Sequence, residues 1–283
     1  IDEIIDNTVL RYVGNTPLIN IKTPQNISDK VEIYAKLEYF NPGGSVKDRP
    51  ILRMIKEAIK SGELTHDKAI LDSTSGNAGI AYSMIGAALG YEVDLVIPGN
   101  ASEERKRSIR AYGARIITTD PIKGYDEAIR KAHEMLEENP DKYYMPDQYA
   151  NKYNPIAHYE TTGKEILEQT EGKVTHFVCG VGTGGTVMGV GRRLKEHNPD
   201  IKIYVIKPED FPGIEGLKPM GSEYIKPKIY REDFIEDQTF FITSEEAKDT
   251  CCTLAKETGL FVGQSSGAFM KGALELAGEI NEG

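Results

Sequence analysis

The residues most able to do chemistry lie in a short glycine-rich run that ends in a lysine. The run is Asn41-Pro42-Gly43-Gly44-Ser45-Val46-Lys47-Asp48-Arg49. Its glycines permit a tight turn, and a helical pattern of apolar residues begins directly afterwards, at Ile51. The amine of Lys47 is therefore expected near a helix N-terminus, where partial positive charge lowers the pKa of a second cation. A lysine tuned in this way can form a Schiff base.

A second glycine-rich run follows a predicted strand and opens a predicted helix. It reads Gly180-Val181-Gly182-Thr183-Gly184-Gly185-Thr186. Backbone N–H groups at such a position form a cradle for a phosphate. The run also matches the Gly-x-Gly-x-x-Gly pattern of dinucleotide-binding proteins, which expects an acidic residue at the end of the next strand. Here that strand ends in Ile206-Lys207-Pro208, so a simple phosphate is favoured.

Two polar runs precede further predicted helices. Hydroxyl and N–H groups in Ser73-Thr74-Ser75-Gly76-Asn77-Ala78-Gly79 suit a small carboxylate. The run Gly263-Gln264-Ser265-Ser266-Gly267 stands before the last predicted helix. Taken alone, each run is typical of ordinary helix capping, and only the other motifs favour a binding role.

The elements that must position these runs alternate between strand and helix. Strands are predicted at 31–37, 69–72, 93–98, 115–119, 175–179, 201–206 and 260–262. Helices are predicted at 51–61, 78–90, 102–112, 125–138, 164–169, 187–197, 244–257 and 266–277, with Ser102 and Ser244 as N-caps. Residues 207–242 have no clear pattern. The alternation predicts an α/β protein of two doubly wound, mostly parallel domains, with the active site in the cleft between them.

Composition excludes several classes of function. The 283 residues carry a formal net charge of -10, which argues against nucleic-acid binding because a phosphate backbone needs a basic face. No apolar run reaches membrane-spanning length, and no signal-peptide pattern opens the chain. Three cysteines without framework spacing fit a reducing cytoplasm, with Cys179 expected to be buried. No metal site is predicted, since His-x-x-x-His and Cys-x-x-Cys are absent from the sequence.

Together the motifs resemble one family. Lys47 in its glycine run, Thr74–Asn77, Gly182–Thr186 and Ser265–Gly267 occur in order, after an opening Asn15-Thr16-Pro17-Leu18. This pattern is similar to the cysteine synthase / cystathionine β-synthase family, the fold-type-II pyridoxal-phosphate enzymes, over nearly the whole chain. The resemblance implies pyridoxal 5'-phosphate as cofactor, a small-molecule amino-acid substrate and a cytoplasmic homodimer without nucleic-acid or membrane partners. It also implies a large cofactor-binding domain (1–38 and 150–283) and a smaller substrate-binding domain (39–149).

The resemblance also implies residue roles. Lys47 would hold the cofactor and then move the α-proton, and Ser265 and Asn77 would bond the ring nitrogen and the 3'-oxygen. The cofactor phosphate would be cradled by Gly182, Thr183, Gly184, Gly185 and Thr186. The substrate α-carboxylate would be held by Thr74, Ser75, Gly76, Asn77 and Gln148. Among these, Lys47 and Ser75 would be catalytic residues. A third candidate catalytic residue, Asp233, comes from a segment that departs from the family pattern.

Departures from the family pattern leave the direction of the reaction open. Lys207 replaces the common glutamate before proline, and residues 209–237 lack the pattern of O-acetylserine-specific members. One direction makes cysteine from O-acetylserine and sulfide. The other consumes cysteine, releases hydrogen sulfide and adds water, a thiol or a second cysteine. Adding water requires a general base, for which the segment offers Glu215, Glu223, Asp233 and Glu236, with Asp233 the first choice. A non-catalytic binding scaffold is the alternative of another class, which Lys47 and the complete phosphate loop disfavour.

Overall fold

The computed structural model describes residues 1–283 except 22–26, 75, 236, 281 and 282. The chain divides into two compact units. Unit 1 comprises Ile1–Asn15 and Glu38–Ala157, and unit 2 comprises Thr16–Leu37 and His158–Gly283. Each unit is built around its own sheet. The assignment of one domain to the cofactor and the other to the substrate stays a prediction.

The sheet of unit 1 is parallel and has β3 (Ala69–Ser73) at its centre. Its strand order is β5-β4-β3-β6, with β4 at Val93–Pro98, β5 at Arg115–Thr119 and β6 at Tyr143–Tyr144. The chain moves outward from β3 to β5 and then returns to the other side of β3. The order of connection therefore reverses between β3 and β6, and the crevice at such a switch point is where open α/β sheets bind ligands.

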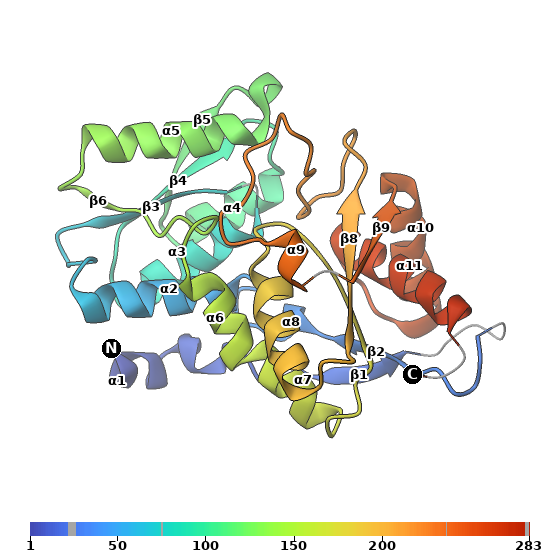
Figure 1. The fold of residues 1–283 in the computed structure, drawn as a ribbon. Helices are drawn as coiled ribbons and strands as arrows, with labels where there is room; N and C mark the ends of the chain where they lie inside the picture. The colour runs from blue at the N-terminus through green and yellow to red at the C-terminus, as the bar shows by residue number, and fades with distance from the viewer. Residues whose placement is uncertain (22–26, 75, 236, 281–282) are drawn as a thin grey trace. The chain divides into compact units, whose positions relative to one another are not determined.

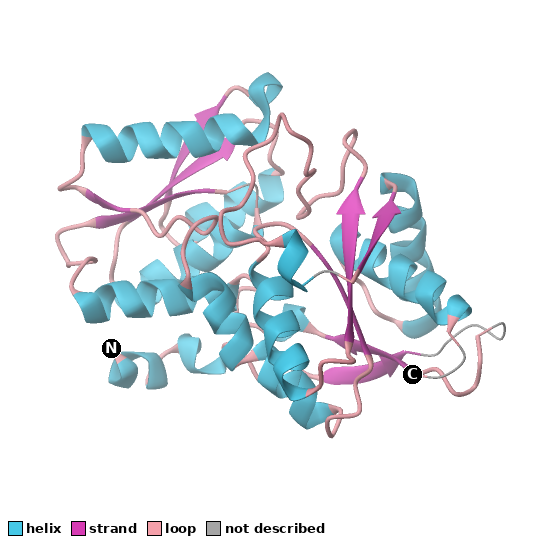
Figure 2. Cartoon of the chain, viewed as in Figure 1, coloured by secondary structure: helices cyan, strands magenta, loops and turns pink. Residues whose placement is uncertain are grey.

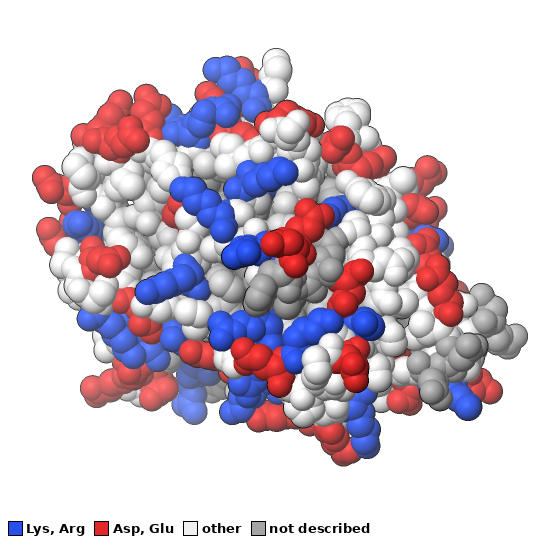
Figure 3. Space-filling view, viewed as in Figure 1, with Lys and Arg blue, Asp and Glu red and all other residues white. Residues whose placement is uncertain are grey.

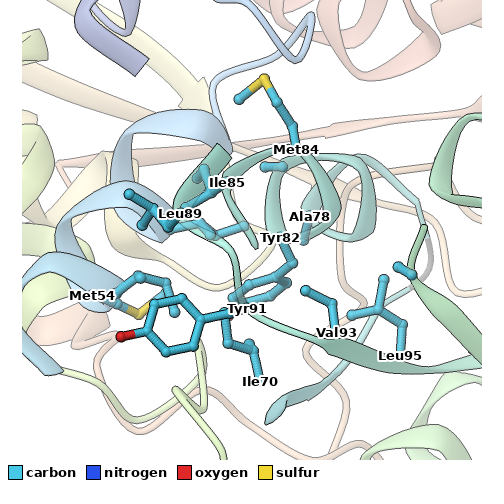
Figure 4. Packing of buried hydrophobic residues seen from close by; sticks show 14 of the residues in the cluster. Met54, Ile70, Ala78, Tyr82, Met84, Ile85, Leu89, Tyr91, Val93 and Leu95 are labelled. Carbon is cyan, nitrogen blue, oxygen red and sulfur yellow. The ribbon is translucent and has the colours of Figure 1, made fainter. Parts of the chain in front are cut away.

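Helices cover both faces of this sheet, because β3 is apolar on both sides. Helix α5 (Gly124–Glu138) lies on one face and α2 (Asp48–Ser61) and α3 (Asn77–Leu89) lie on the other (Figure 1). Leu71 packs with α5, whereas Ile70 packs with α2 and α3. The second face is the larger core (Figure 4). There Met54, Tyr82, Leu89 and Tyr91 belong to the same apolar cluster as Ile70 and Leu95. The remaining elements of unit 1 are α1 (Asp2–Asp6), α4 (Glu103–Ala111) and three short 3-10 helices, Val9–Tyr12, Glu38–Phe40 and Pro121–Lys123. Helix α6 (Tyr153–Glu160) spans the boundary with unit 2.

Unit 2 has a parallel sheet of order β7-β8-β9, with strands at His176–Gly180, Lys202–Pro208 and Gln238–Ile242. Helices α7 (Thr162–Gln169) and α8 (Gly185–His197) pack on one face, and α10 (Ser244–Thr258) and α11 (Gln264–Glu279) pack on the other. A separate antiparallel pair joins β1 (Leu18–Ile21) to β2 (Ile33–Lys36). Between β8 and α9 (Glu232–Ile235) runs a long segment, 209–231, without helix or strand (Figure 2).

Two sequence predictions are wrong. Residues 260–262 form no strand. They join α10 to α11 without pairing to a strand, and the side chain of Phe261 is 90 % exposed. The N-cap of α10 is Thr243, not Ser244. Thr243 and Glu246 form a reciprocal capping box, while the Ser244 hydroxyl accepts a hydrogen bond from Gln264 at 2.6 Å. The buried state predicted for Cys179 is confirmed.

The surface carries both signs of charge. On the face shown in Figure 3, lysine and arginine side chains are interspersed with aspartate and glutamate. Within the part of the chain that the structure describes, no helix combines the length and apolar character needed to span a membrane.

Candidate active site

Lys47 is held where the sequence places it, at the start of α2. It is the N-cap residue of that helix, and the preceding turn uses Gly44 at φ +81°, a conformation that favours glycine. The side chain of Asp48 closes the turn by accepting the N–H of Gly43 at 2.5 Å. Burial lowers the pKa of the half-buried Lys47 amine, in the predicted direction. The cause is loss of solvent rather than the helix terminus.

A buried network of charged side chains supports this lysine loop. Arg49 donates two hydrogen bonds to the carboxylate of Glu38, both of 2.7 Å. Asn41 donates to the same carboxylate at 2.9 Å and accepts the N–H of Gly14 at 2.8 Å. Burial raises the pKa of Asp48 to about 6, with the nearby Glu38 charge acting in the same sense. The two-pronged Arg49–Glu38 pair fixes the loop in position and in angle.

The predicted carboxylate-binding residues meet at the carboxyl end of β3. The buried hydroxyl oxygen of Thr74 accepts the N–H groups of Gly76 and Gly79, both at 3.0 Å. The side-chain amide of Gln148, which follows β6, donates to the carbonyl of Ser73 at 3.1 Å. Strands β3 and β6 thus bring Thr74 and Gln148 to the switch point of the sheet. Asn77 opens α3 and is exposed. Ser75 lies outside the described residues.

Arg105 is a residue of this loop that sequence reasoning missed. A Cβ added to Gly76 would lie 2.8 Å from both Cδ and Nε of Arg105, so the arginine packs directly on the loop. Partial burial lowers the pKa of its guanidinium. In the sequence Arg105 is only the third residue of a helix capped by Ser102, as predicted. Nothing in the sequence around Arg105 indicates that it contacts Gly76.

The predicted phosphate loop lies at the start of α8, in unit 2. Gly184 is the N-cap and has φ +86°, a left-handed conformation that explains the glycine. The first N–H groups of a helix have no acceptor within it and point outward, ready for an anion. Thr186 is fixed by buried His158, whose Nε2 lies 3.4 Å from the threonine hydroxyl. The other ring nitrogen of His158 lies 3.0 Å from the hydroxyl of Thr162. His158 also went unnoticed in the sequence, where the histidines are scattered.

The segment without regular structure packs against this loop. A Cβ added to Gly182 would lie 2.8 Å from the carbonyl oxygen of Gly216, and the N–H of Lys218 donates to Val181 at 2.9 Å. A Cβ added to Gly216 would lie 3.5 Å from the hydroxyl of Ser265, the predicted partner of the ring nitrogen. Residues 216–218 therefore join the phosphate loop to Ser265 within unit 2.

The candidate bases of that segment are exposed. Asp233 lies on α9 with 78 % of its side chain exposed, 3.5 Å from Arg231. Glu215 and Glu223 are also exposed, and Glu236 lies outside the described residues. Neighbouring Glu232 pairs with Lys207 at 2.5 Å, which fastens α9 to the end of β8. Among the residues that the structure describes, no three His, Cys, Asp or Glu side chains are grouped to hold a metal.

Comparison with known proteins decides the family. A family model described as "Pyridoxal-phosphate dependent enzyme" matches residues 9–283. The chain belongs to the pyridoxal-phosphate-dependent enzyme family. A cysteine synthase of Aquifex aeolicus is 51% identical over 96% of this chain and 84% of its own length. The structure of a cysteine synthase from Entamoeba histolytica has a TM-score of 0.88 at 38% identity, covering 96% of this chain and 82% of that one. The structure of a hydrogen sulfide-producing enzyme from Fusobacterium nucleatum has a TM-score of 0.87 at 38% identity, covering 96% and 93%.

These similarities place the chain in the cysteine synthase branch of the pyridoxal-phosphate-dependent family and confirm the predicted fold class and cofactor. The dinucleotide alternative is excluded. The residues present fit pyridoxal phosphate. Glycine backbone at a helix N-terminus suits a doubly charged phosphate, and an amine of lowered pKa suits an aldehyde.

Proposed function

We propose that the protein is a cysteine synthase that converts O-acetylserine and sulfide into cysteine and acetate. The observation that carries the proposal is the meeting of Thr74 and Gln148 at the end of β3, in the unit that also holds Lys47. An α-amino acid needs both a carboxylate site and an amine-exchanging lysine. The 51% identity to a cysteine synthase over 96% of the chain supports this substrate class.

Each residue has one task in the proposed reaction. Thr74, Gln148 and the N–H groups of the loop to Asn77 hold the α-carboxylate, and Lys47, whose pKa burial lowers, takes the α-proton. Residues Gly182 to Thr186 hold the cofactor phosphate, Ser265 the ring nitrogen and Asn77 the 3'-oxygen. When bound, pyridoxal phosphate supplies an aldehyde for the substrate amine and an electron-withdrawing ring that acidifies the α-carbon. A serine hydroxyl leaves that ring a moderate electron sink, which suits prompt loss of acetate. A cytoplasmic homodimer is part of this proposal.

A second candidate function runs from cysteine. The similarity to a hydrogen sulfide-producing enzyme, which extends over 93% of that chain, favours it. Sulfide would leave cysteine, and water, a thiol or a second cysteine would add to give serine, a thioether or lanthionine. Asp233 is the proposed base for the addition of water.

Product analysis tests both candidates. The holoenzyme is incubated with O-acetylserine plus sulfide, and separately with cysteine alone, and the amino acids are identified by mass spectrometry. We expect rapid cysteine formation in the first reaction and slow or no sulfide release in the second. Sulfide release from cysteine that outpaces cysteine formation would replace the first candidate with the second.

A further inference from the structure

A buried carboxylate lies directly beneath the candidate carboxylate-binding loop. Asp72 is the fourth residue of β3 and is 3 % exposed. Its Oδ1 accepts the N–H of Ser73 at 2.7 Å, and its Oδ2 accepts the hydroxyl of Tyr82 from α3. The backbone of Gln148 also lies near the same carboxylate and acts to lower its pKa. Asp72 therefore contacts both chain segments that form the site.

Gln148 is fixed at this place from several directions. Its side-chain amide donates to the carbonyl of Ser73, and its own carbonyl accepts from Asn154 at 2.8 Å. The Tyr125 hydroxyl donates to the Ser73 carbonyl at 3.1 Å. These contacts orient the two segments, and the carboxylate of Asp72 holds the Ser73 backbone to which the Gln148 side chain is bonded.

Asp72 is costly to bury. The groups with the largest effect on its pKa are Tyr82, the backbones of Ser73 and Gln148, and a second acid, Asp147, and none of these four is a cation. Burial, the largest cause, raises the pKa of Asp72 to about 7, and the charge of Asp147 acts in the same sense. The ring of Tyr82 is packed in the apolar core beneath the strand (Figure 4). An apolar residue would fill this site at lower cost, so the carboxylate has a use that packing alone does not explain.

We propose that Asp72 is a positioning residue that sets the distance between the Thr74 loop and Gln148, and through them the affinity for the substrate α-carboxylate. It accepts the N–H of Ser73, whose carbonyl accepts the side-chain amide of Gln148, and so fixes the end of β3 against the end of β6. Asp72 does not touch the substrate. This inference rests on the proposed amino-acid site, but not on which group leaves or adds.

A double-mutant cycle tests the inference. The dissociation constant of L-alanine, an amino acid without a leaving group, is measured by calorimetry on the holoenzyme of the wild type, Asp72→Asn, Gln148→Ala and the double variant. Asp72→Asn is expected to weaken binding about tenfold, the effect of losing one well-placed hydrogen bond. Because Asp72 acts through Gln148, the double variant should bind within about twofold of Gln148→Ala alone.

The matched control is Asp94→Asn. Asp94 is a buried carboxylate on the adjacent strand β4, paired with Leu71 in register and bonded to Arg115 and Tyr143. Asp94→Asn should lower the melting temperature but leave the L-alanine affinity as in the wild type. Combined with Gln148→Ala, it should leave the affinity as in Gln148→Ala alone. If Asp72→Asn does not yield folded holoenzyme, Asp72→Glu displaces the same oxygens by one methylene and should show the same coupling.

The outcomes separate this inference from the proposed function. Wild-type affinity in Asp72→Asn, or independent effects of Asp72 and Gln148, would overturn the positioning role. Coupled effects in an enzyme that makes no cysteine would leave the positioning role standing and remove the proposed function. A holoenzyme that binds no amino acid would remove both.

Discussion

Tyr230 packs directly on Gly184 of the phosphate loop. A Cβ added to Gly184 would lie 2.7 Å from the Cβ of Tyr230, and the glycine has φ +86°. Gly184→Ala would therefore suffer both backbone strain of about 1–2 kcal/mol and a clash. We expect the dissociation constant for pyridoxal phosphate to rise at least about tenfold, as measured by absorbance titration of the cofactor-free protein.

Gly113→Ala is the control for this change, because Gly113 has φ +88° but no atom within 4 Å of an added Cβ. It carries the strain without the clash, far along the chain from the phosphate loop. Equal loss of cofactor in the two variants would show that Tyr230 is irrelevant.

Lys47→Ala should abolish turnover without unfolding the protein. Lys47 lies at the end of a turn rather than in the core, so its truncation removes little packing. Loss of the acid–base group should lower the rate by about a thousandfold. In the wild type, borohydride reduction followed by peptide mass spectrometry should find the cofactor on the peptide that contains Lys47. Lys60→Ala, a change at an exposed lysine of the same helix, should behave as wild type.

Thr74 is expected to serve structure and binding together. Its oxygen accepts two backbone N–H groups. Thr74→Ala therefore leaves the buried N–H of Gly76 without its acceptor and removes one of the two acceptors of the Gly79 N–H, the other being the carbonyl of Gly76. We expect a loss of about 1–3 kcal/mol of stability in urea unfolding and about tenfold weaker amino-acid binding. Thr74→Ser keeps the hydroxyl and should preserve both. A Thr74→Ser variant as impaired as Thr74→Ala would show that the methyl group, not the hydroxyl, matters.

Asp72 should make the folded protein less stable as the pH rises, which is the reverse of the usual effect of an aspartate. Its folded pKa of about 7 lies above the ordinary value of about 3.9. The folded protein thus holds this proton more tightly, and that contribution to stability is lost as the pH rises from about 4 to 7. Asp72→Asn cannot titrate. The wild type should therefore lose melting temperature relative to Asp72→Asn between pH 5.5 and 8.0, by at least about 2 °C.

For Asp94→Asn, the melting-temperature difference from the wild type should not depend on pH. The Asp94 pKa is lowered by hydrogen bonds from Arg115 and Tyr143 that outweigh its burial, which is the largest single influence and acts to raise it. Both pH values lie above that pKa, so the difference between wild type and Asp94→Asn should stay constant. A constant difference for Asp72→Asn as well would contradict the raised pKa.

Asp233→Asn should separate the two directions of the reaction. Sulfide is a strong nucleophile and needs no base, so cysteine synthesis should remain within about twofold of wild type. Serine formation from cysteine and water, where it occurs, should fall at least about tenfold. Steady-state rates of both reactions check this, with Glu223→Gln as a control at another exposed acid of the same segment. Unchanged serine formation would eliminate Asp233 as the base.

Much of the fold was predictable because local patterns determine it. Strands β4 and β5 have the predicted bounds, since β-branched runs there are bounded by glycine, proline or charge. Ser102 caps α4 as its position before Glu103 indicates. The strand Gln238–Ile242 was missed and 260–262 was wrongly predicted. Both are short apolar stretches, and only pairing with a neighbour such as β8 decides which becomes a strand.

The candidate site likewise has a part that local sequence patterns predict and a part that they do not. Lys47, Thr74 and the phosphate loop lie in glycine-rich or capping motifs that are visible in any short window of sequence. The contacts of Arg105 with Gly76, of Tyr230 with Gly184 and of Asp72 with Gln148 join residues that are far apart in the chain. The periodicity of apolar residues along the sequence does not predict such a contact, because the contact forms only when whole strands and helices have packed.

The Arg49–Glu38 pair beneath the lysine loop has a consequence for the solvent conditions that the enzyme tolerates. Its side chains are 1% and 16% exposed, so dissolved ions cannot approach the pair closely. Helix pairs that are more exposed, such as Arg192–Glu196 with side chains 60% and 46% exposed, are open to screening. At high ionic strength the surface pairs weaken first, while the loop that presents Lys47 keeps its shape.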